Sequence, residues 1–167
     1  REVSSILRLA YELEIPVTFR AAGTSLSGQA ITDSVLVLLA GNWTGARVES
    51  NGERIALEPG VVGSRANDIL KPFGRKIGPD PASINSAMIG GIAANNASGM
   101  CCGVNFNSYR TLHSMRVILA DGHPLDTNDP ESCERFRRNH RELLNSLASL
   151  AKQVFSDSEL SDRIKHK

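Results

Sequence analysis

The residues best suited to hold a ligand form a loop of small side chains directly after a short apolar stretch. The segment from Pro16 to Gln29 reads Pro-Val-Thr-Phe-Arg-Ala-Ala-Gly-Thr-Ser-Leu-Ser-Gly-Gln. Because no long side chain stands between Ala21 and Ser25, a ligand can reach the backbone, and successive N–H groups can converge on a phosphate. Arg20 and the neighbouring hydroxyls add donors that phosphate oxygens accept. The alternative is an ordinary surface turn, since Gly and Ser are common in turns.

A second stretch of small side chains runs from Gly78 to Gly103 and reads Gly-Pro-Asp-Pro-Ala-Ser-Ile-Asn-Ser-Ala-Met-Ile-Gly-Gly-Ile-Ala-Ala-Asn-Asn-Ala-Ser-Gly-Met-Cys-Cys-Gly. Its prolines stiffen a turn, and Gly90-Gly91 marks a place where two backbones, or a backbone and a ligand, can touch. Tight helix packing is the competing explanation. The chain contains no Gly-x-x-x-x-Gly-Lys-Ser/Thr and no Gly-x-Gly-x-x-Gly after a strand, so neither familiar phosphate loop is present.

Together the two segments resemble the FAD-binding domain of the vanillyl-alcohol oxidase type flavoproteins, in the branch that contains D-lactate, glycolate and D-2-hydroxyglutarate dehydrogenases. In that family the loop reads Arg-Gly-Ala/Gly-Gly-Thr-Ser-x-Ser-Gly, which matches Arg20–Gly28. The second motif, Pro-Asp-Pro-Ser-Ser and then Ile-Gly-Gly-x-x-Ala-x-Asn, matches Pro79–Ser83 and Ile89–Asn96. The run Ser98–Gly103 is similar to the subgroup whose flavin module is fused to an iron-sulfur module. Ala21 and Ser98 stand where the family usually has Gly.

The resemblance implies an FAD site. The first loop would hold the pyrophosphate, the second segment would line the ribityl chain and the ring edge, and the strand at Ile118 would meet the adenine. FAD would be bound non-covalently, because relatives with an 8α-histidyl bond carry His at the position held here by Thr24. The cofactor-binding residues implied are Arg20, Ala21, Ala22, Gly23, Thr24, Ser25, Gly28, Gln29, Pro79, Asp80, Ala87, Met88, Gly90, Gly91, Asn95, Asn96, Gly99 and Ile118.

The function implied is that of the FAD-binding portion of a dehydrogenase that oxidises a D-2-hydroxy acid by hydride transfer to FAD. The chain begins within a helix, and we expect it to be a truncated domain that is inactive alone. A cap domain outside it would bind the hydroxy acid, and an electron acceptor or iron-sulfur module would take the electrons. The alternatives are an oxidoreductase of the same fold acting on another alcohol, a sugar or a peptidoglycan precursor, and a non-redox phospholigand-binding or structural module.

Composition narrows the class of protein. The chain has 167 residues, a net charge of +1 and 41% hydrophobic content, which is ordinary for one globular domain and argues against nucleic-acid binding. Its 3 cysteines and 4 histidines show no metal-ligand spacing, so we expect no metal site, no iron-sulfur cluster and no catalytic residue within the chain. Without a signal peptide or an apolar run of ~18 residues, we expect a cytoplasmic protein, at most peripheral to a membrane.

Periodicity and turn signals predict an α+β fold with small mixed or antiparallel sheets flanked by helices. We expect one partial FAD-binding domain over residues 1–167, with a motif-bearing core at about 16–127, a helical segment at about 129–155 and a polar tail at 156–167. The expected elements are a helix ending at Glu14, strands at 17–20 and 35–39, a hairpin over 47–58 turning at Asn51-Gly52, a helix at 64–70 capped by Ser64, a strand at 115–120 turning at Asp121-Gly122, and a helix from Asp129 to Val154.

Overall fold

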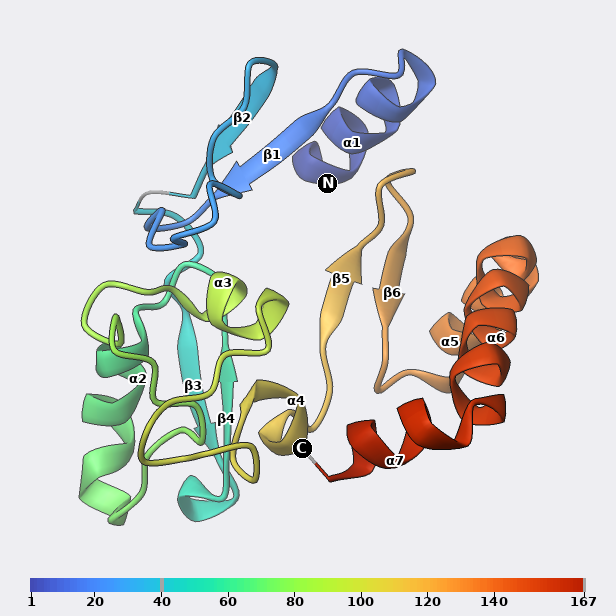
Figure 1. The fold of residues 1–167 in the computed structure, drawn as a ribbon. Coiled ribbons are helices and arrows are strands. Elements are labelled where there is room, and N and C mark those ends of the chain that lie inside the picture. The colour runs from blue at the N-terminus through green and yellow to red at the C-terminus, as the bar shows by residue number, and fades with distance from the viewer. Residues whose placement is uncertain (40, 167) are drawn as a thin grey trace. The chain divides into compact units, whose positions relative to one another are not determined.

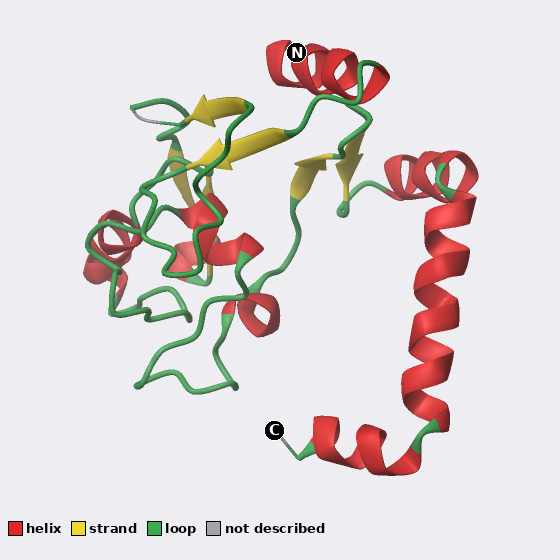
Figure 2. Cartoon of the chain, turned by 45° about the horizontal axis from the view of Figure 1, so that its top comes forward, coloured by secondary structure: helices red, strands yellow, loops and turns green. Residues whose placement is uncertain are grey.

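The structure is a computed structural model that describes residues 1–39 and 41–166. The chain forms two compact units, one made of residues 9–113 and the other of residues 1–8 together with the segment from 114 onward. Figure 1 labels the elements, and Figure 2 separates helices from strands. Each unit is described by itself.

In chain order the elements are α1 (Glu2–Glu12), β1 (Val17–Arg20), β2 (Val35–Leu38), β3 (Ala46–Glu49), the 3₁₀ turn η1 (Ser50–Gly52), β4 (Arg54–Leu57), α2 (Gly63–Leu70), the 3₁₀ turn η2 (Lys71–Phe73), α3 (Ile89–Ala94), α4 (Ser108–Thr111), β5 (Arg116–Ile118), β6 (Pro124–Asp126), α5 (Pro130–Asn139), α6 (Arg141–Ser156) and α7 (Ser158–Lys165).

A parallel pair of strands carries the first small-residue loop. The chain leaves α1 at Glu14, which has a φ of 54°, and the Ile15 N–H donates to the Ala10 carbonyl at 2.8 Å. Pro16 cannot continue the helix, so the chain becomes extended and forms β1. β1 pairs in parallel with β2, and beyond the pair the Leu39 N–H donates to the Arg20 carbonyl at 3.0 Å. The loop between these strands is therefore fixed at both ends.

The predicted hairpin over residues 47–58 is confirmed as the antiparallel pair of β3 and β4. The predicted helix after it is confirmed as α2, but its predicted cap is wrong. Val62 is the N-cap residue and provides no side-chain hydrogen bond. The N–H groups of Gly63 and Ser64 donate instead to the carbonyls of Ala87 and Ile84, each at 2.9 Å. Backbone from the second motif thus satisfies the donors that a capping side chain usually accepts from.

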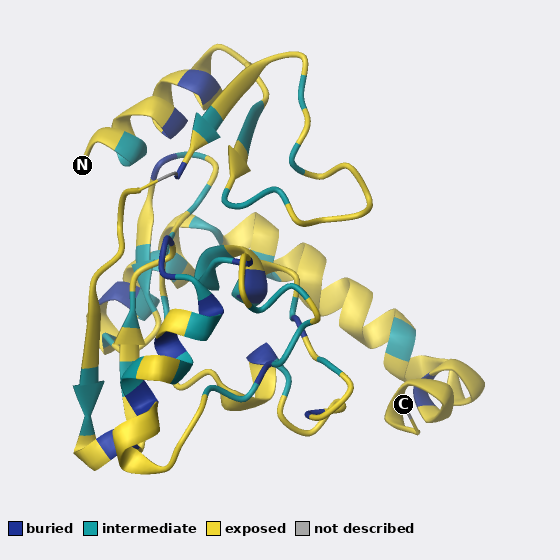
Figure 3. Ribbon diagram, turned by 90° about the vertical axis from the view of Figure 1, so that its left-hand side faces the viewer, coloured by how far each residue is buried: buried dark blue, intermediate teal, exposed yellow. Residues whose placement is uncertain are grey.

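One buried cluster of this unit lies within the second motif, while Val61, Ala66 and Leu70 are buried around α2. Ala87, Ile92 and Ala97 form a buried cluster, and Ile84 and Ile89 pack against it. The dark blue segments of Figure 3 show how short the fully buried stretches are. Small side chains keep the backbones in this cluster close together, so the motif is itself a packed element of the fold.

The second unit begins with the predicted strand and turn. β5 pairs antiparallel with β6, and the Gly122 N–H donates to the Leu119 carbonyl at 2.9 Å across the turn at Asp121-Gly122. The predicted helix start is also confirmed, since the Asp129 side chain accepts the Glu131 N–H at 3.0 Å and Pro130 opens α5.

The single helix predicted from Asp129 to Val154 is wrong. His140 has φ −118° and ψ 36°, which ends α5, and α6 begins at the next residue. The tail beyond is helical as well, because Asp157 accepts the Leu160 N–H at 2.9 Å and caps α7. No residue of α6 is buried, as its yellow ribbon in Figure 3 shows.

The predicted fold class is confirmed. Over residues 1–39 and 41–166, three two-stranded sheets, one parallel and two antiparallel, lie among helices, which is an α+β arrangement. Among the described residues, no helix has both the length and the apolar composition needed to cross a membrane.

Candidate cofactor site

The first loop turns sharply at its glycines. Gly23 and Gly28 have φ values of 68° and 76°, in the left-handed region that Gly enters without steric cost. A Cβ built on Gly23 would lie 2.8 Å from Nε of Arg20, so the guanidinium packs directly over this glycine. A Cβ on Gly28 would meet nothing within 4 Å. Ala21, where the family usually has Gly, does not have a positive φ, so the loop takes its course without strain there.

The loop keeps its backbone donors free. In the part of the chain that the structure describes, none of the N–H groups from Ala21 to Ser25 donates to a protein acceptor, and Arg20 has no acidic partner. The far side of the loop is braced, because the Ser25 hydroxyl donates to Oε1 of Gln29 and accepts the Ser27 N–H at 3.3 Å. Backbone donors without a protein acceptor bind water or a ligand. The loop therefore presents a guanidinium and a row of N–H groups to whatever approaches it.

The second segment contains a tight backbone crossing. The Asp80 N–H donates to the Ser98 carbonyl at 3.2 Å, and a Cβ on Gly99 would overlap the Asp80 carbonyl. At this crossing the small residue is required by protein packing. The Asp80 carboxylate is partly exposed and pairs with the Lys76 ammonium at 3.5 Å.

The start of α3 is fastened to the rest of the unit. The Gly90 N–H donates to the Pro59 carbonyl at 2.9 Å, and a Cβ on Gly90 would lie 2.8 Å from Cβ of Pro59. The neighbouring Gly60 N–H donates to the Trp43 carbonyl at 2.9 Å, which connects this region to the chain that follows β2. Gly91 differs, since it is exposed and a Cβ there would meet nothing within 4 Å. A ligand can approach the backbone of α3 at this point.

The end of α3 is held by α4. Asn96 has a φ of 45°, and its Oδ1 accepts the Tyr109 N–H at 3.0 Å. The buried Ser108 hydroxyl donates to the carbonyls of Ile92 at 2.9 Å and Ala97 at 3.1 Å. The Asn side chain is therefore used partly for structure, while the adjacent Asn95 is exposed.

The structure places the expected cofactor residues in two groups and leaves one apart. Those from Arg20 to Gln29 form the first loop. Those from Pro79 to Gly99 lie in the packed segment around α3, where Pro79 and Ala87 are buried and therefore offer a ligand little side-chain surface. Ile118 lies in β5 and belongs to the other unit.

Cys101 and Cys102, beside this segment, are both free thiols. Cys102 is buried, with Sγ 3.3 Å from the Gly103 carbonyl, whereas Cys101 is exposed.

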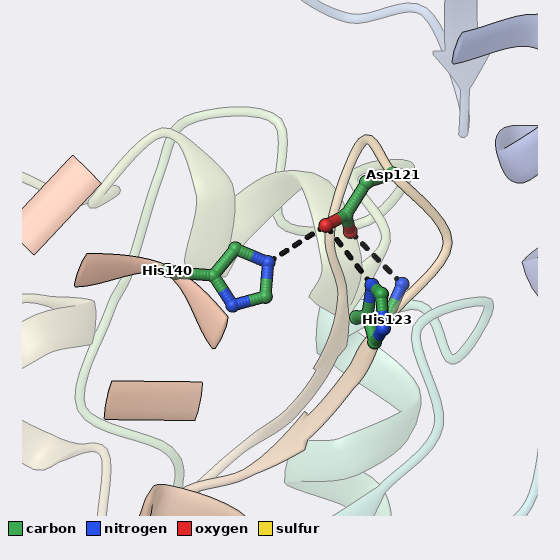
Figure 4. A group of neighbouring side chains, drawn as sticks. All are labelled: Asp121, His123 and His140. Atoms are coloured by element: carbon green, nitrogen blue, oxygen red, sulfur yellow. Dashed lines mark hydrogen bonds and ion pairs between the residues drawn. The ribbon is translucent and has the colours of Figure 1, made fainter. Parts of the chain in front are cut away.

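One polar cluster was missed by the sequence analysis. Nε2 of His140 lies 2.7 Å from Oδ2 of Asp121, and Nδ1 of His123 lies 3.0 Å from the same oxygen (Figure 4). Burial raises the pKa of Asp121, but the His123 backbone N–H and the two imidazoles outweigh burial, so that the pKa lies below its ordinary value. The Asp121-Gly122-His123 turn was visible in the sequence. The approach of His140, from a helix junction, was not.

Comparison with known proteins decides the family. The sequence model of a family described as "FAD binding domain" matches residues 1–128. The chain belongs to this FAD-binding domain family. The predicted recognition is confirmed, and the two small-residue segments lie inside the matched range.

Relatives of this FAD-binding domain include an oxidase subunit and several dehydrogenases. Glycolate oxidase subunit GlcD of Escherichia coli is 32% identical over 126 residues, which cover 74% of this chain and 25% of that protein. The D-lactate dehydrogenase of Archaeoglobus fulgidus is 34% identical, with 72% of this chain and 27% of that protein covered. The D-2-hydroxyglutarate dehydrogenase of Haemophilus influenzae is 28% identical over 79% of this chain. The chain thus spans about a quarter of the length of the first two relatives.

Solved structures agree on the fold. 6-Hydroxy-D-nicotine oxidase from Arthrobacter nicotinovorans aligns with a TM-score of 0.64 at 18% identity, covering 74% of this chain and 27% of that one. An alkyldihydroxyacetonephosphate synthase aligns with a TM-score of 0.63 at 18% identity, covering 78% of this chain and 26% of that one.

Proposed function

We propose that the first loop holds the pyrophosphate of FAD, and that the segment around α3 lines the cofactor farther along. The observation that carries this proposal is that, among the described residues, the N–H groups from Ala21 to Ser25 have no protein acceptor and the Arg20 guanidinium packed over Gly23 has no acidic partner. A pyrophosphate carries two negative charges, and charge-assisted hydrogen bonds to it are worth ~1.5–3 kcal/mol each. The loop supplies such donors without losing any internal hydrogen bond.

The exposed backbone at Gly91 supports the same assignment. A flat ring or a ribityl chain needs close access to a backbone, and Gly91 leaves that access open. The exposed Asn95 amide, at the end of the same helix, offers donors and an acceptor to the cofactor's polar edge. The other expected cofactor residues from Pro79 to Gly99 would shape the surface on which the cofactor lies. Ile118 would contact the adenine.

The whole protein would be an oxidoreductase of D-2-hydroxy acids such as D-lactate, glycolate or D-2-hydroxyglutarate. The names of its relatives support this substrate class. Bound FAD would supply the redox chemistry of the oxidation as a hydride acceptor, and the residues of this chain would bind and orient it. In this chain, residues 16–127 carry the two cofactor motifs. Other parts of the whole protein, which we expect to be cytoplasmic, would bind the substrate and pass electrons to an acceptor or an iron-sulfur module.

The test is a titration of the cofactor-free chain with FAD, followed by flavin fluorescence. In Gly23→Ala the new Cβ would lie 2.8 Å from Nε of Arg20, so the guanidinium must move. Loss of one charge-assisted hydrogen bond of ~1.5–3 kcal/mol predicts roughly 10- to 150-fold weaker FAD binding.

The matched control is Gly74→Ala. Gly74 has a similar φ of 65°, and a Cβ there would meet nothing within 4 Å. This variant carries the same backbone strain away from the loop and should bind FAD as the unmodified chain does. Equal FAD affinity of Gly23→Ala and Gly74→Ala would refute the loop as the pyrophosphate site, and so would a chain that binds no FAD.

A further inference from the structure

We propose that Asp121, His123 and His140 form a binding site for a divalent transition-metal ion of the zinc class. Two imidazole nitrogens and one carboxylate are a ligand set that Zn²⁺ accepts in proteins, with water completing the coordination. The site lies wholly within the unit formed by residues 1–8 and 114–166. It is separate from the proposed cofactor loop and does not depend on it.

The spacing of the ligand atoms supports the proposal. One nitrogen from each imidazole and one carboxylate oxygen all lie within 4.8 Å of one another. The two nitrogens approach the same oxygen, at 2.7 Å for His140 and 3.0 Å for His123, as Figure 4 shows. Ligand atoms around a tetrahedral Zn²⁺ are roughly 3.3 Å apart, given bonds of about 2.0–2.1 Å. To admit the ion, the Asp121 oxygen has to withdraw from the two nitrogens by up to about half an ångström, and the nitrogens, which lie within 4.8 Å of each other, have to reach the same spacing.

Each ligand is held by contacts that do not involve a metal. The His123 N–H donates to Oδ1 of Asp121 at 3.0 Å, which fixes the carboxylate within the turn. Gly122 is buried with a φ of 80°, and the Ser4 hydroxyl donates to its carbonyl. The His140 ring stacks on Phe136, with centroids 4.8 Å apart and an interplanar angle of 24°. Preorganisation of this kind reduces the entropy cost of binding.

The surroundings leave room for further ligands. His123 and His140 line a cavity of about 290 Å³ together with Asp126 and Ser132. Its volume is many times the 10–15 Å³ that a water molecule requires, so water can complete the coordination. The His123 side chain is 48% exposed, which gives an ion a path from solvent.

The competing explanation is a purely structural hydrogen-bonded bridge, in which each imidazole donates to the Asp121 carboxylate. Metal binding would instead take the Nε2 lone pair of His140, and the ring proton would move to Nδ1. In the described structure Nδ1 is buried and has no hydrogen-bond partner. A metal-bound imidazole usually donates its other ring N–H to an acceptor, and loss of that acceptor weakens metal binding by about 10- to 100-fold. Since Nδ1 of His140 has no such acceptor in the described structure, we expect a dissociation constant of the order of micromolar.

The experiment uses the full 167-residue chain, stripped with a chelator, titrated with Zn²⁺ by calorimetry and with Co²⁺ by visible absorption. We expect one ion per chain and Co²⁺ d–d bands without the charge-transfer absorption that a cysteine thiolate would produce. His123→Ala should bind Zn²⁺ at least ~10-fold more weakly, since one ligand is lost. His113→Ala, an exposed histidine of the other unit, is the matched control and should bind unchanged.

His123 is the ligand chosen for substitution because its side chain is half exposed. His123→Ala therefore removes a metal ligand with little loss of packing. Asp121→Asn keeps an acceptor for the His123 N–H while removing the charge, and it should weaken binding to a similar extent. Absence of stoichiometric Zn²⁺ binding, or equal affinities for His123→Ala and His113→Ala, would overturn the site and leave the hydrogen-bonded bridge. Thiolate bands that disappear in Cys101→Ser would overturn it as well, by assigning the ion to the exposed cysteine.

Discussion

Gly91→Ala is expected to stabilise the chain and at the same time to weaken FAD binding. Gly91 lies inside α3, is exposed, and has open space where a Cβ would stand. Ala is favoured over Gly in a helix by ~0.8–1.0 kcal/mol, chiefly because it reduces the conformational entropy of the unfolded chain. With no protein atom to collide with, the free energy of unfolding should rise by up to about 1 kcal/mol.

The effect on FAD has the opposite sign if the cofactor lies against this backbone. A methyl group pushed into a packed contact costs ~1–3 kcal/mol, which corresponds to roughly 5- to 150-fold weaker binding. Gly90→Ala provides the contrast one residue earlier. Its Cβ would lie 2.8 Å from Cβ of Pro59, so the variant should lose stability by ~1–3 kcal/mol before any ligand is considered.

Urea denaturation measures the two stabilities, and FAD titration by flavin fluorescence measures the affinities. A Gly91→Ala chain that is more stable and binds FAD more weakly locates the cofactor at α3. If Gly91→Ala instead binds FAD as tightly as the unmodified chain, this backbone does not contact the cofactor, and the assignment around α3 is wrong. The first loop is judged separately by Gly23→Ala.

Two further outcomes are expected. Ser108→Ala should lower the free energy of unfolding by ~1–3 kcal/mol, because it removes a buried hydroxyl that donates to the Ile92 and Ala97 carbonyls. Urea denaturation measures this loss, and the exposed Ser156→Ala is the control that should be nearly neutral. Acid precipitation of the FAD-loaded chain should give a colourless pellet, because Thr24 stands where covalently flavinylated relatives carry His; a yellow pellet would contradict non-covalent binding.

Elements defined by local signals were predictable from the sequence. Pro16 ends α1, Asn51-Gly52 lies in the hairpin turn, and Asp129 with Pro130 starts α5. In each case the deciding interaction lies within a few residues along the chain, so composition and spacing are sufficient. The first loop was found for the same reason, since its small residues are contiguous.

Features that depend on distant partners were not predictable. Ser64 has the right chemistry for a cap, but carbonyls about 20 residues later accept the first N–H groups of α2. The apolar periodicity that runs through α5 and α6 gives no sign of the break at His140, where the ring stacks on Phe136 and meets Asp121 from another element. Helical propensity alone favours continuation, and tertiary contacts override it.

The sequence left open whether small residues in the second segment serve packing or a ligand, and the structure shows which of these glycines protein packing requires. A side chain at Gly99 would collide with the Asp80 carbonyl, and one at Gly90 with Pro59, so protein packing alone requires these glycines. A Cβ built on Gly28 or Gly91 would meet no described atom within 4 Å beyond the adjacent residues and, for Gly91, the backbone of its own helix. Gly28 is still explained by its positive φ, whereas Gly91 is helical and solvent-exposed, where Ala would be more stable. Local energetics therefore favour Ala at that position, and the proposed contact between the cofactor and this backbone offers a physical reason for a glycine there.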